Sequence, residues 1–588
     1  MRQFLKFTLA SMVGFFLMSL LAFFIFMGII MASISSFDKK ETVTVPDKTI
    51  LMVSFDQPIA ERSSDNPFDN MRLFGGSRAK SLGLNDILLN IKKASEDANV
   101  KGMYMEMSDV PSGQATVEEI RNALVDFKKK GKFIVSYGEI FTQKAYYLAS
   151  VSDKIYLNPV GMFEFKGLSA ETMFFKGLLD KLYIQPQIIR HGKFKSAVEP
   201  FILDKMSDAS KQQSNALVSS IWNHMLANIS DSRKIAQDDL NTIANELKVQ
   251  TPQDAISLKL VDNILYKDQV LDELKGRVNI SNAKDLKFMS LNKYANSTTK
   301  SNNASDRIAV VYAYGDIVSG NGSNDNIGSE RISKAIRQAR LDEKVKAIVL
   351  RVNSPGGSAL ASDVIWREMI LAKKVKPIVV SMGDVAASGG YYISCAANKI
   401  FAYPNTITGS IGVFGIIPNM KEMFNKKLGI TFDGVKTNTY ADFIPVTRPM
   451  TESEKKIMTK GVETTYATFI THVGEGRNMR PESVDSIGQG RVWSGVDAKR
   501  IGLIDEFGGI NEAIKEAAKL AKLSTYRIKE LPERKDAFTQ FLEELTGEYA
   551  TRVAKKEMGA AYPYFKALKR MQTMQGVQAM MPYDIEIK

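Results

Sequence analysis

Cysteine and histidine are nearly absent from this chain of 588 residues. Cys395 is the only cysteine, which excludes an intrachain disulfide and any metal site built from cysteines. Its place in the apolar run 391–400 favours a small buried core residue over a reactive thiol. The three histidines are His191, His224 and His472. Few histidines are therefore available to act as a general base, which is the role that histidine most often has in enzymes.

The sequence also lacks the motifs that bind common cofactors. It contains no Walker A pattern and no His-Glu-x-x-His, so we expect no metal, nucleotide or coenzyme. The net charge of +13 is spread over scattered lysine pairs, without an arginine-rich run or a basic stripe interleaved with aromatic residues. This distribution argues against nucleic acid as a partner and is more compatible with an anionic bilayer surface.

Long apolar runs are absent except for one near the N-terminus. Residues 7–34 carry no charge and are mostly Phe, Leu, Met, Ile and Ala, and a bilayer span needs about 20 such residues. Arg2 and Lys6 precede the run, which predicts a cytoplasmic N-terminus and an exported body. A cleaved signal peptide has a shorter apolar core, and although small residues at the end of the run leave cleavage open, we expect an uncleaved anchor. The body is then expected on the periplasmic side of a bacterial inner membrane.

The rest of the chain contains an internal duplication. Tyr391–Ile400 echoes Tyr146–Ile155 at an offset of 245, and Leu503–Asp505 echoes Leu260–Asp262 at an offset of 243. So small a drift over that distance indicates duplication rather than chance. The predicted divisions are an N-terminus, anchor and stalk (1–46), a first repeat (47–295), a polar linker (296–306), a second repeat (307–530) and a helical, Met-rich tail (531–588). We expect this tail to pack against the body or a second subunit, with contact with the membrane as the minor alternative.

Strand and helix patterns alternate within each repeat. This order predicts βαβ units around a mainly parallel sheet, an α/β fold present in tandem. The expected strands are Ile50–Phe55, Gly102–Met107, Phe133–Ser136, Ile308–Ala313, Ala347–Val352 and Ile378–Met382, and the expected helices are Asn85–Glu96, Thr116–Lys130, Ser329–Leu341 and Ser362–Ala372.

The two repeats differ at the positions where a site would lie. Ser388, in Ala-Ala-Ser-Gly-Gly, has Gln143 as its twin, whereas Lys195 falls opposite Ala441 in a weaker alignment. One half therefore offers a nucleophile without a base, and the other offers a base without a nucleophile. This asymmetry predicts one site shared between the halves.

The residues around Ser388 suit acyl-transfer chemistry. Ser388 lies between a predicted strand and a helical run, so the N–H groups of the coming helix point at the space beside it. The Ser-Pro-Gly-Gly turn at 354–357, one βα unit earlier, presents backbone N–H groups that suit an oxyanion hole. A serine needs a base, and Lys195 qualifies if an apolar seat lowers its pKa. His191 is the rival base.

Four strings in order resemble the signal peptide peptidase A family in its long, duplicated bacterial form. They are Lys195–Phe201, Ser354–Gly357, Ala386–Tyr391 and Thr408–Gly415. The resemblance covers essentially the whole chain. It implies a fold like that of crotonase and Clp protease, a Ser–Lys dyad, and a homotetramer on the periplasmic face of the membrane. The implied role is degradation of remnant signal peptides after their release from preproteins.

Transferred residue by residue, the resemblance implies that Ser388 is the nucleophile and Lys195 the general base, with Ser410 orienting the amine. The backbone N–H groups of Gly357 (or Gly356) and Gly389 would form the oxyanion hole. Two other classes remain open at this point: a crotonase-type acyl-CoA enzyme, which shares the predicted core, and a catalytically inactive membrane scaffold.

Overall fold

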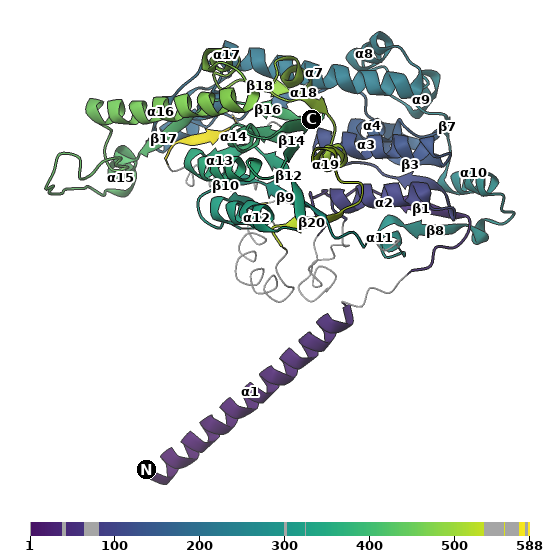
Figure 1. Ribbon diagram of the computed structural model, residues 1–588, viewed down its shortest axis with the longest axis horizontal. Coiled ribbons are helices and arrows are strands. Elements are labelled where there is room, and N and C mark those ends of the chain that lie inside the picture. Colours follow the sequence, from purple (N-terminus) through teal and green to yellow (C-terminus); the bar gives the residue numbers. More distant parts are fainter. Residues whose placement is uncertain are drawn as a thin grey trace.

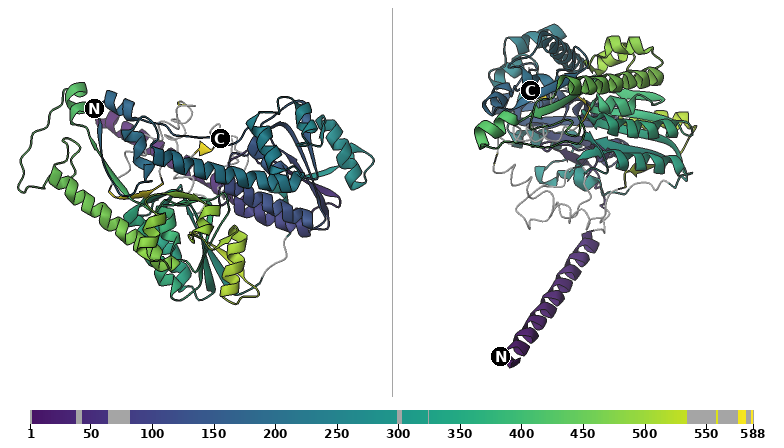
Figure 2. Two further views of the ribbon diagram at one scale, coloured as in Figure 1. Left: turned by 90° about the horizontal axis from the view of Figure 1, so that it is seen from above. Right: turned by 90° about the vertical axis from the view of Figure 1, so that its left-hand side faces the viewer.

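A computed structural model describes residues 2–37, 43–63, 82–298, 303–323, 325–533, 558, 576–581 and 586–587. Helix α1 (Arg2–Phe37) projects from one side of the body (Figures 1 and 2). Its segment Gln3–Ala22 is long and apolar enough to cross a membrane, with a mean hydropathy of 1.9, and none of it is buried in the body. The predicted anchor is therefore present as a free apolar helix.

The first repeat is built on a parallel sheet of six strands, in the order β7-β4-β3-β2-β1-β8. Alternate residues of each strand face opposite sides of this sheet. Leu51 and Met103 enter the core that contains α2 and α3, whereas Ile50 and Tyr104 pack with α10. The strands are β1 (Thr49–Val53), β2 (Val100–Glu106), β3 (Phe133–Phe141), β4 (Lys154–Phe163), β7 (Asn263–Ile264) and β8 (Lys287–Ser290).

The second repeat has the same strand order in its own sheet. Strands β19, β15, β14, β12, β9 and β20 follow one another as parallel neighbours, and β16 and β18 extend the sheet beside β14. This order corresponds strand for strand to the order β7-β4-β3-β2-β1-β8 of the first repeat, as a duplication requires. The strands are β9 (Arg307–Tyr314), β12 (Val345–Ser354), β14 (Ile378–Ala387), β15 (Lys399–Ala402), β16 (Ile407–Gly409), β18 (Val492–Ser494), β19 (Glu506–Phe507) and β20 (Arg527–Leu531).

A third sheet joins the repeats. Its order is β11-β10-β13-β21-β17-β6, and only β6 comes from the first repeat. The strands are β6 (Gln185–Arg190), β10 (Asp316–Val318), β11 (Asn326–Gly328), β13 (Gly356–Ser358), β17 (Phe414–Asn419) and β21 (Gln578–Met580); a separate pair consists of β5 (Ala170–Glu171) and β22 (Glu586–Ile587). Strands β21 and β22 belong to the predicted helical tail, so the helix expectation is wrong for Gln578–Met580 and for Glu586–Ile587. Nearly all the rest of that tail lies outside the described residues.

Helices of the described residues cover these sheets, and the predicted ones are confirmed to within three residues at each end. The two longest helices of the body, α7 and α16, occupy corresponding places in the two repeats, and both lie along the upper side of the body in Figure 1. The helices are α2 (Leu84–Glu96), α3 (Gln114–Lys129), α4 (Gln143–Ala149), α5 (Lys176–Lys181), α6 (Glu199–Ile202), α7 (Asp208–Arg233), α8 (Gln237–Asn245), α9 (Pro252–Ser257), α10 (Lys267–Val278), α11 (Leu291–Tyr294), α12 (Ser329–Leu341), α13 (Ala359–Lys373), α14 (Gly389–Ser394), α15 (Lys421–Leu428), α16 (Glu452–Arg477), α17 (Pro481–Ile487), α18 (Gly495–Arg500) and α19 (Ile510–Leu520), with short 3-10 turns at Ser196–Val198 and Ala283–Asp285.

Buried polar contacts hold the two repeats together. The guanidinium of Arg351 in β12 donates to Glu61 at 2.8 Å and to Glu119 in α3 at 2.9 Å. Asp384 in β14 accepts from the main chain and the hydroxyl of Thr116, at 2.8 and 2.7 Å. Removing one partner would leave a buried charge unpaired, which is costly. The halves are therefore locked in the arrangement that the shared site needs.

Candidate active site

Ser388 lies where β14 ends and α14 begins, as the sequence predicts. It caps α14 with a φ of 54° and a ψ of −112°, a conformation that costs a non-glycine residue energy and that occurs at functional sites. Its N–H donates to the carbonyl of Gly409 at 2.8 Å, which holds the strained turn in place. A serine on such a turn between strand and helix projects its hydroxyl from the sheet edge, as the nucleophilic serines of α/β-hydrolases do.

The amine of Lys195 meets the hydroxyl of Ser388. Its Nζ lies 3.0 Å from Ser388 Oγ, and it also contacts Ser410 through Oγ at 3.1 Å and the carbonyl oxygen at 3.2 Å. All three side chains are fully buried. The shared site predicted from the twin comparison is thus assembled, with the base and the hydroxyl 193 residues apart in sequence.

Burial sets the charge state of this lysine. Desolvation holds the pKa of the Lys195 amine well below its ordinary value of 10.5, because burial penalises the charged form. No carboxylate opposes this effect among its causes. A neutral amine has a lone pair that can accept the proton of Ser388, which an ammonium group cannot do.

Strand pairing in the third sheet positions Lys195 next to Ser388. Strand β6 pairs antiparallel with β17 from Arg190–Phe414 to Gln185–Asn419. Lys195 lies five residues beyond the end of β6 at Arg190, just before the 3-10 turn that begins at Ser196. Gln213 of α7 then fixes the segment, because its amide donates to the carbonyl of Phe194 at 3.1 Å and to Ser196 Oγ at 2.8 Å. Strand pairing and a helix side chain together place the amine.

Two glycines that the sequence analysis missed make room for the lysine. A Cβ at Gly490 would lie 2.6 Å from Lys195 Cβ, and Gly490 has a φ of 78°. A Cβ at Gly412 would lie 3.3 Å from Lys195 Cδ and 2.8 Å from Gly490 Cα. The lysine stem therefore packs directly against backbone. The string Gly488-Gln-Gly490 could have indicated a position that needs glycine, but nothing in the sequence links Gly490 to Lys195.

Ser410 and the predicted oxyanion glycines lie beside the serine. Ser410 follows β16 with a φ of 50°, and its N–H donates to Arg491 at 2.7 Å. The N–H of Gly356 donates to Ser354 Oγ at 3.1 Å, so it is not free to donate to an oxyanion. A Cβ at Gly356 would lie 2.7 Å from the nitrogen of Gly389, so the turn and the start of α14 are in close approach.

The histidines are engaged elsewhere. The ring of His191 bonds Glu463 Oε2 at 2.7 Å and stacks on Tyr466. His224 bonds Glu118 at 2.6 Å, and His472 stacks on Trp366. The rival base is thus tied to a carboxylate, and Lys195 is the basic side chain in contact with Ser388. Cys395 is fully buried in the core, and desolvation raises the pKa of its thiol to about 12.

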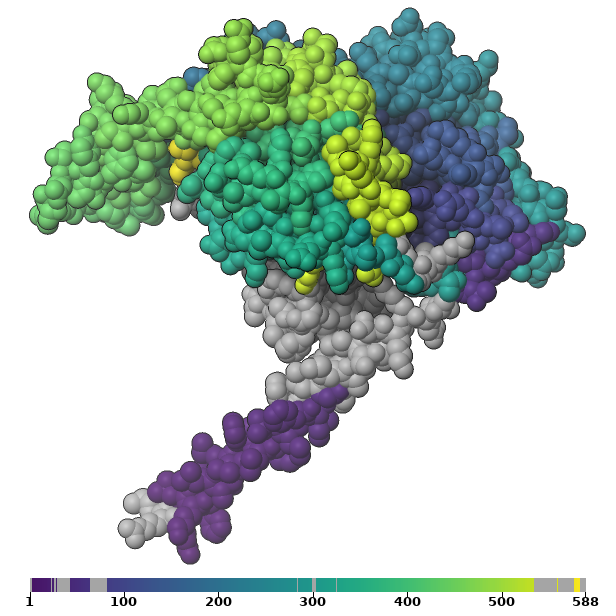
Figure 3. Space-filling model, in the orientation of Figure 1, coloured from purple at the N-terminus to yellow at the C-terminus, as the bar shows by residue number. Residues whose placement is uncertain are grey.

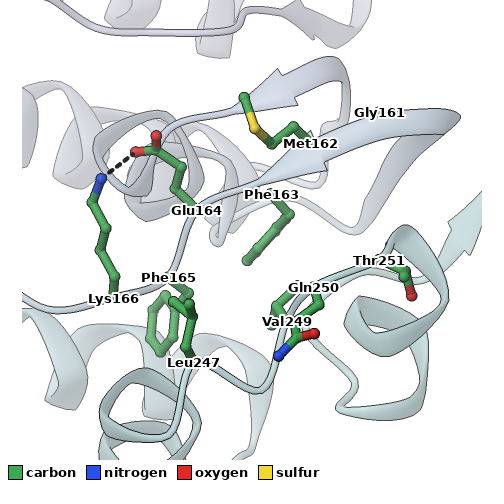
Figure 4. A pocket seen from close by; sticks show the side chains of 10 residues that line it. All are labelled: Gly161, Met162, Phe163, Glu164, Phe165, Lys166, Leu247, Val249, Gln250 and Thr251. Carbon is green, nitrogen blue, oxygen red and sulfur yellow. Dashed lines mark ion pairs between the residues drawn. The ribbon is translucent and has the colours of Figure 1, made fainter.

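The first repeat has a structural residue where the second has its serine. Gln143 begins α4, and its Oε1 accepts from the N–H groups of Lys166 and Gly167 at 3.0 and 2.9 Å. A hollow of about 210 Å³ lies nearby, between the segment 161–166 and Leu247–Thr251 (Figure 4). The side chains of Glu164 and Lys166 form an ion pair at its edge. The hollow is lined chiefly by apolar groups such as Phe163 and Phe165, away from Ser388.

The segment of the second repeat that corresponds to the lysine segment does not contribute to an active site. Residues 429–441 are exposed, and the loop after α15 extends away from the body in Figure 1. Ala441 lies in this loop. The asymmetry between the repeats therefore leaves one assembled serine–lysine pair within the described part of the chain.

Comparison with known proteins agrees with this geometry. The profile of peptidase family S49 matches residues 126–281 and 370–524, which together make up more than half of the chain, and the profile of Clp protease matches residues 299–408. Protease 4 of Salmonella typhi is 37% identical over 505 residues, covering 82% of this chain and 81% of the relative.

Two further relatives span a similar range. Protease 4 of Haemophilus influenzae is 35% identical, covering 84% of this chain and 83% of the relative. The chloroplastic serine protease SPPA of Arabidopsis thaliana is 32% identical, covering 85% and 74%. These matches do not support an acyl-CoA enzyme or an inactive scaffold. The chain belongs to peptidase family S49 and is a serine-type peptidase with a duplicated, Clp-protease-like α/β fold.

Proposed function

We propose that this chain is a membrane-anchored endopeptidase that uses a Ser388–Lys195 dyad to degrade remnant signal peptides. The observation that carries the dyad is the 3.0 Å contact between Lys195 Nζ and Ser388 Oγ in a fully buried setting. Neutral Lys195 takes the proton of Ser388 as the hydroxyl attacks a peptide carbonyl, and it returns that proton to the leaving amine. It then activates the water that hydrolyses the acyl-enzyme.

The surrounding groups have supporting roles in this mechanism. Ser410 accepts from the lysine amine and so aims its lone pair at Ser388. Gly357 and Gly389 supply the oxyanion N–H groups, because the N–H of Gly356 is bonded to Ser354. Stabilising the oxyanion by prepositioned donors is worth about 10²–10³-fold per donor.

The anchor favours substrates that are themselves in the membrane. The apolar helix α1 would hold the body against the bilayer as a single span, with the catalytic region on the periplasmic side. A relative from Enterococcus faecium, named a putative signal peptide peptidase SppA, is 34% identical over 203 residues covering 34% of this chain. We further propose a homotetramer, in keeping with the family resemblance; light scattering of the detergent-solubilised chain tests it.

Reconstituted vesicles test the proposed substrate. The full chain is incorporated with a preprotein that has just been cut by a leader peptidase, and the fate of both products is followed by mass spectrometry. We expect the released signal peptide to be fragmented and the mature protein to stay whole, with no fragmentation by Ser388→Ala. A signal peptide that survives while a soluble test peptide is hydrolysed would refute the substrate and leave the dyad standing.

A further inference from the structure

Gln489 of the second repeat lies against the segment of the first repeat that carries Lys195. Its carbonyl accepts from the N–H of Phe194 at 2.9 Å, and its side-chain Oε1 accepts from the N–H of Lys193 at 3.4 Å. A Cβ built on Gly192 would lie 2.5 Å from the carbonyl carbon and oxygen of Gln489. The backbone directly before the general base is therefore held by a single residue of the other repeat.

The backbone of Gln489 is itself strained. Its φ is 53°, in the left-handed region, and it stands between Gly488 and Gly490. A residue with a side chain stays in this region only where its surroundings hold it, and such residues gather at functional sites. Ser388 and Ser410 share the conformation, with φ of 54° and 50°. The loop that contains Gln489 therefore needs an anchor.

The anchor consists of one side chain from α16 and one from α17. The hydroxyl of Tyr466 accepts from the N–H of Gln489 at 3.3 Å and donates to Asp485 Oδ1 at 2.6 Å. The same carboxylate oxygen accepts from the side-chain amide of Gln489. Burial, reinforced by the bond to Asp485, raises the pKa of the Tyr466 hydroxyl, so it keeps the proton that it donates. These three residues are called the lysine clamp below, and Figure 3 shows α16 and α17 in light green along the upper face of the second repeat.

Tyr466 also touches the start of the lysine segment. The ring of His191 stacks on the ring of Tyr466, with centroids 3.8 Å apart and an angle of 24° between the planes. The N–H of His191 donates to the carbonyl of Val413 at 3.2 Å. Segment 191–195 is thus fixed at its first residue by Tyr466 directly, and near its last residue by Gln489.

A loosened clamp would change the charge state of the base. The amine of Lys195 contacts Ser388 and Ser410 from the end of a flexible four-carbon stem. Its pKa is low because burial penalises the charged form. If the segment shifted outward, water would reach the amine and its pKa would rise. Less of the lysine would then be neutral at a given pH.

We propose that Gln489, anchored by Tyr466 and Asp485, is a positioning residue that holds the general base against Ser388. This inference rests on the proposed function. The clamp acts through the backbone of the lysine segment and touches none of the reacting atoms. Because α16 and α17 belong to the repeat that carries the nucleophile, the clamp ties the base of one repeat to the nucleophile of the other.

The pH dependence of peptide hydrolysis tests the clamp in two full-length variants. Tyr466→Phe keeps the buried ring but leaves the N–H of Gln489 without its acceptor. Gln489→Gly removes the side-chain contacts and keeps the backbone fold, because glycine adopts positive φ without strain. The matched control is Tyr146→Phe, which removes a buried hydroxyl that donates to the carbonyl of Leu260 at 3.0 Å in the first repeat.

We expect both clamp variants to lower kcat at neutral pH by about tenfold, with little change in KM. The rise of kcat/KM should also move to higher pH, because this profile reports the pKa of the base in the free enzyme. Tyr146→Phe should lose similar stability in urea and keep the wild-type kcat and pH profile.

The outcomes separate the clamp from the proposed function. Wild-type kcat in both clamp variants would overturn the inference and leave the dyad standing. So would a loss of activity without a shift of the pH profile, or a shift of the same size in Tyr146→Phe, because either result is that of a structural role alone. A wild type that hydrolyses no peptide at any pH would overturn the peptidase mechanism and the inference together.

Discussion

Replacing Lys195 with methionine separates catalysis from stability. The three polar contacts of the amine are all with Ser388 and Ser410, so the substitution removes the base and keeps an apolar stem of similar length. A general base contributes about 10²–10⁴-fold. We expect kcat/KM to fall by that factor, which corresponds to about 3–5 kcal/mol of transition-state stabilisation.

The same substitution should not destabilise the fold. Burial lowers the pKa of Lys195 in the folded chain below 10.5, so between the lowered pKa and 10.5 the unfolded chain binds more protons. The free energy of unfolding therefore rises with pH across that window, by about 1.4 kcal/mol per unit, and the lysine is destabilising below it. Lys195→Met should lose this slope and be at least as stable as wild type at neutral pH.

Two measurements check this reasoning. Peptide hydrolysis gives kcat/KM, which in wild type should rise with pH through the lowered lysine pKa. Urea unfolding at several pH values gives the slope. Lys193→Met is the matched control, because Lys193 is exposed on the same segment, and it should behave as wild type. Activity of Lys195→Met within tenfold of wild type, or an unchanged pH slope of stability, would refute the assignment.

Three further predictions concern the groups around the dyad. Ser410→Ala should lower kcat/KM by about fivefold, because one hydrogen bond of about 1 kcal/mol to the lysine amine is lost. Steady-state kinetics measures it, and no change would remove Ser410 from the mechanism. Gly131→Ala and Gly490→Ala both place alanine at positive φ. Gly131→Ala, with open space around it, should cost about 1–2 kcal/mol in urea unfolding and keep its activity. Gly490→Ala, whose Cβ would meet the backbone and stem of Lys195, should cost more than that and also lose most of its activity; equal losses of activity would contradict this. Gln143→Ser introduced into Ser388→Ala should give no labelling by a fluorophosphonate, since the first repeat has no base at that position, and a labelled product would show that the halves are interchangeable.

The duplication made much of this architecture predictable. The offset between the repeats, and the strand–helix alternation within each, anticipated two parallel sheets of the same order. Comparison of twin positions singled out Ser388 and Lys195, because residues that differ between otherwise matching halves are those freed from a purely structural role. The glycines at 356, 357 and 389 followed from their place after buried strands.

What escaped prediction depends on contacts between distant segments. No local pattern relates β6 to β17, yet their pairing is what delivers Lys195. Gly412 and Gly490 are needed only because the lysine stem packs on them. The strand Gln578–Met580 lies in a Met-rich run with helical spacing, and it is extended because the edges of β13 and β17 are available to it. Tertiary pairing overrode local propensity there.

Covalent labelling tests the central claim most directly. Wild type, Ser388→Ala and Lys195→Met are treated with a fluorophosphonate, and the adduct is mapped by tandem mass spectrometry. The shared dyad predicts an adduct on Ser388 in wild type, none in Ser388→Ala and strongly slowed labelling in Lys195→Met. An adduct that persists in Ser388→Ala, or labelling of Lys195→Met at the wild-type rate, would contradict a nucleophile and base contributed by the two repeats.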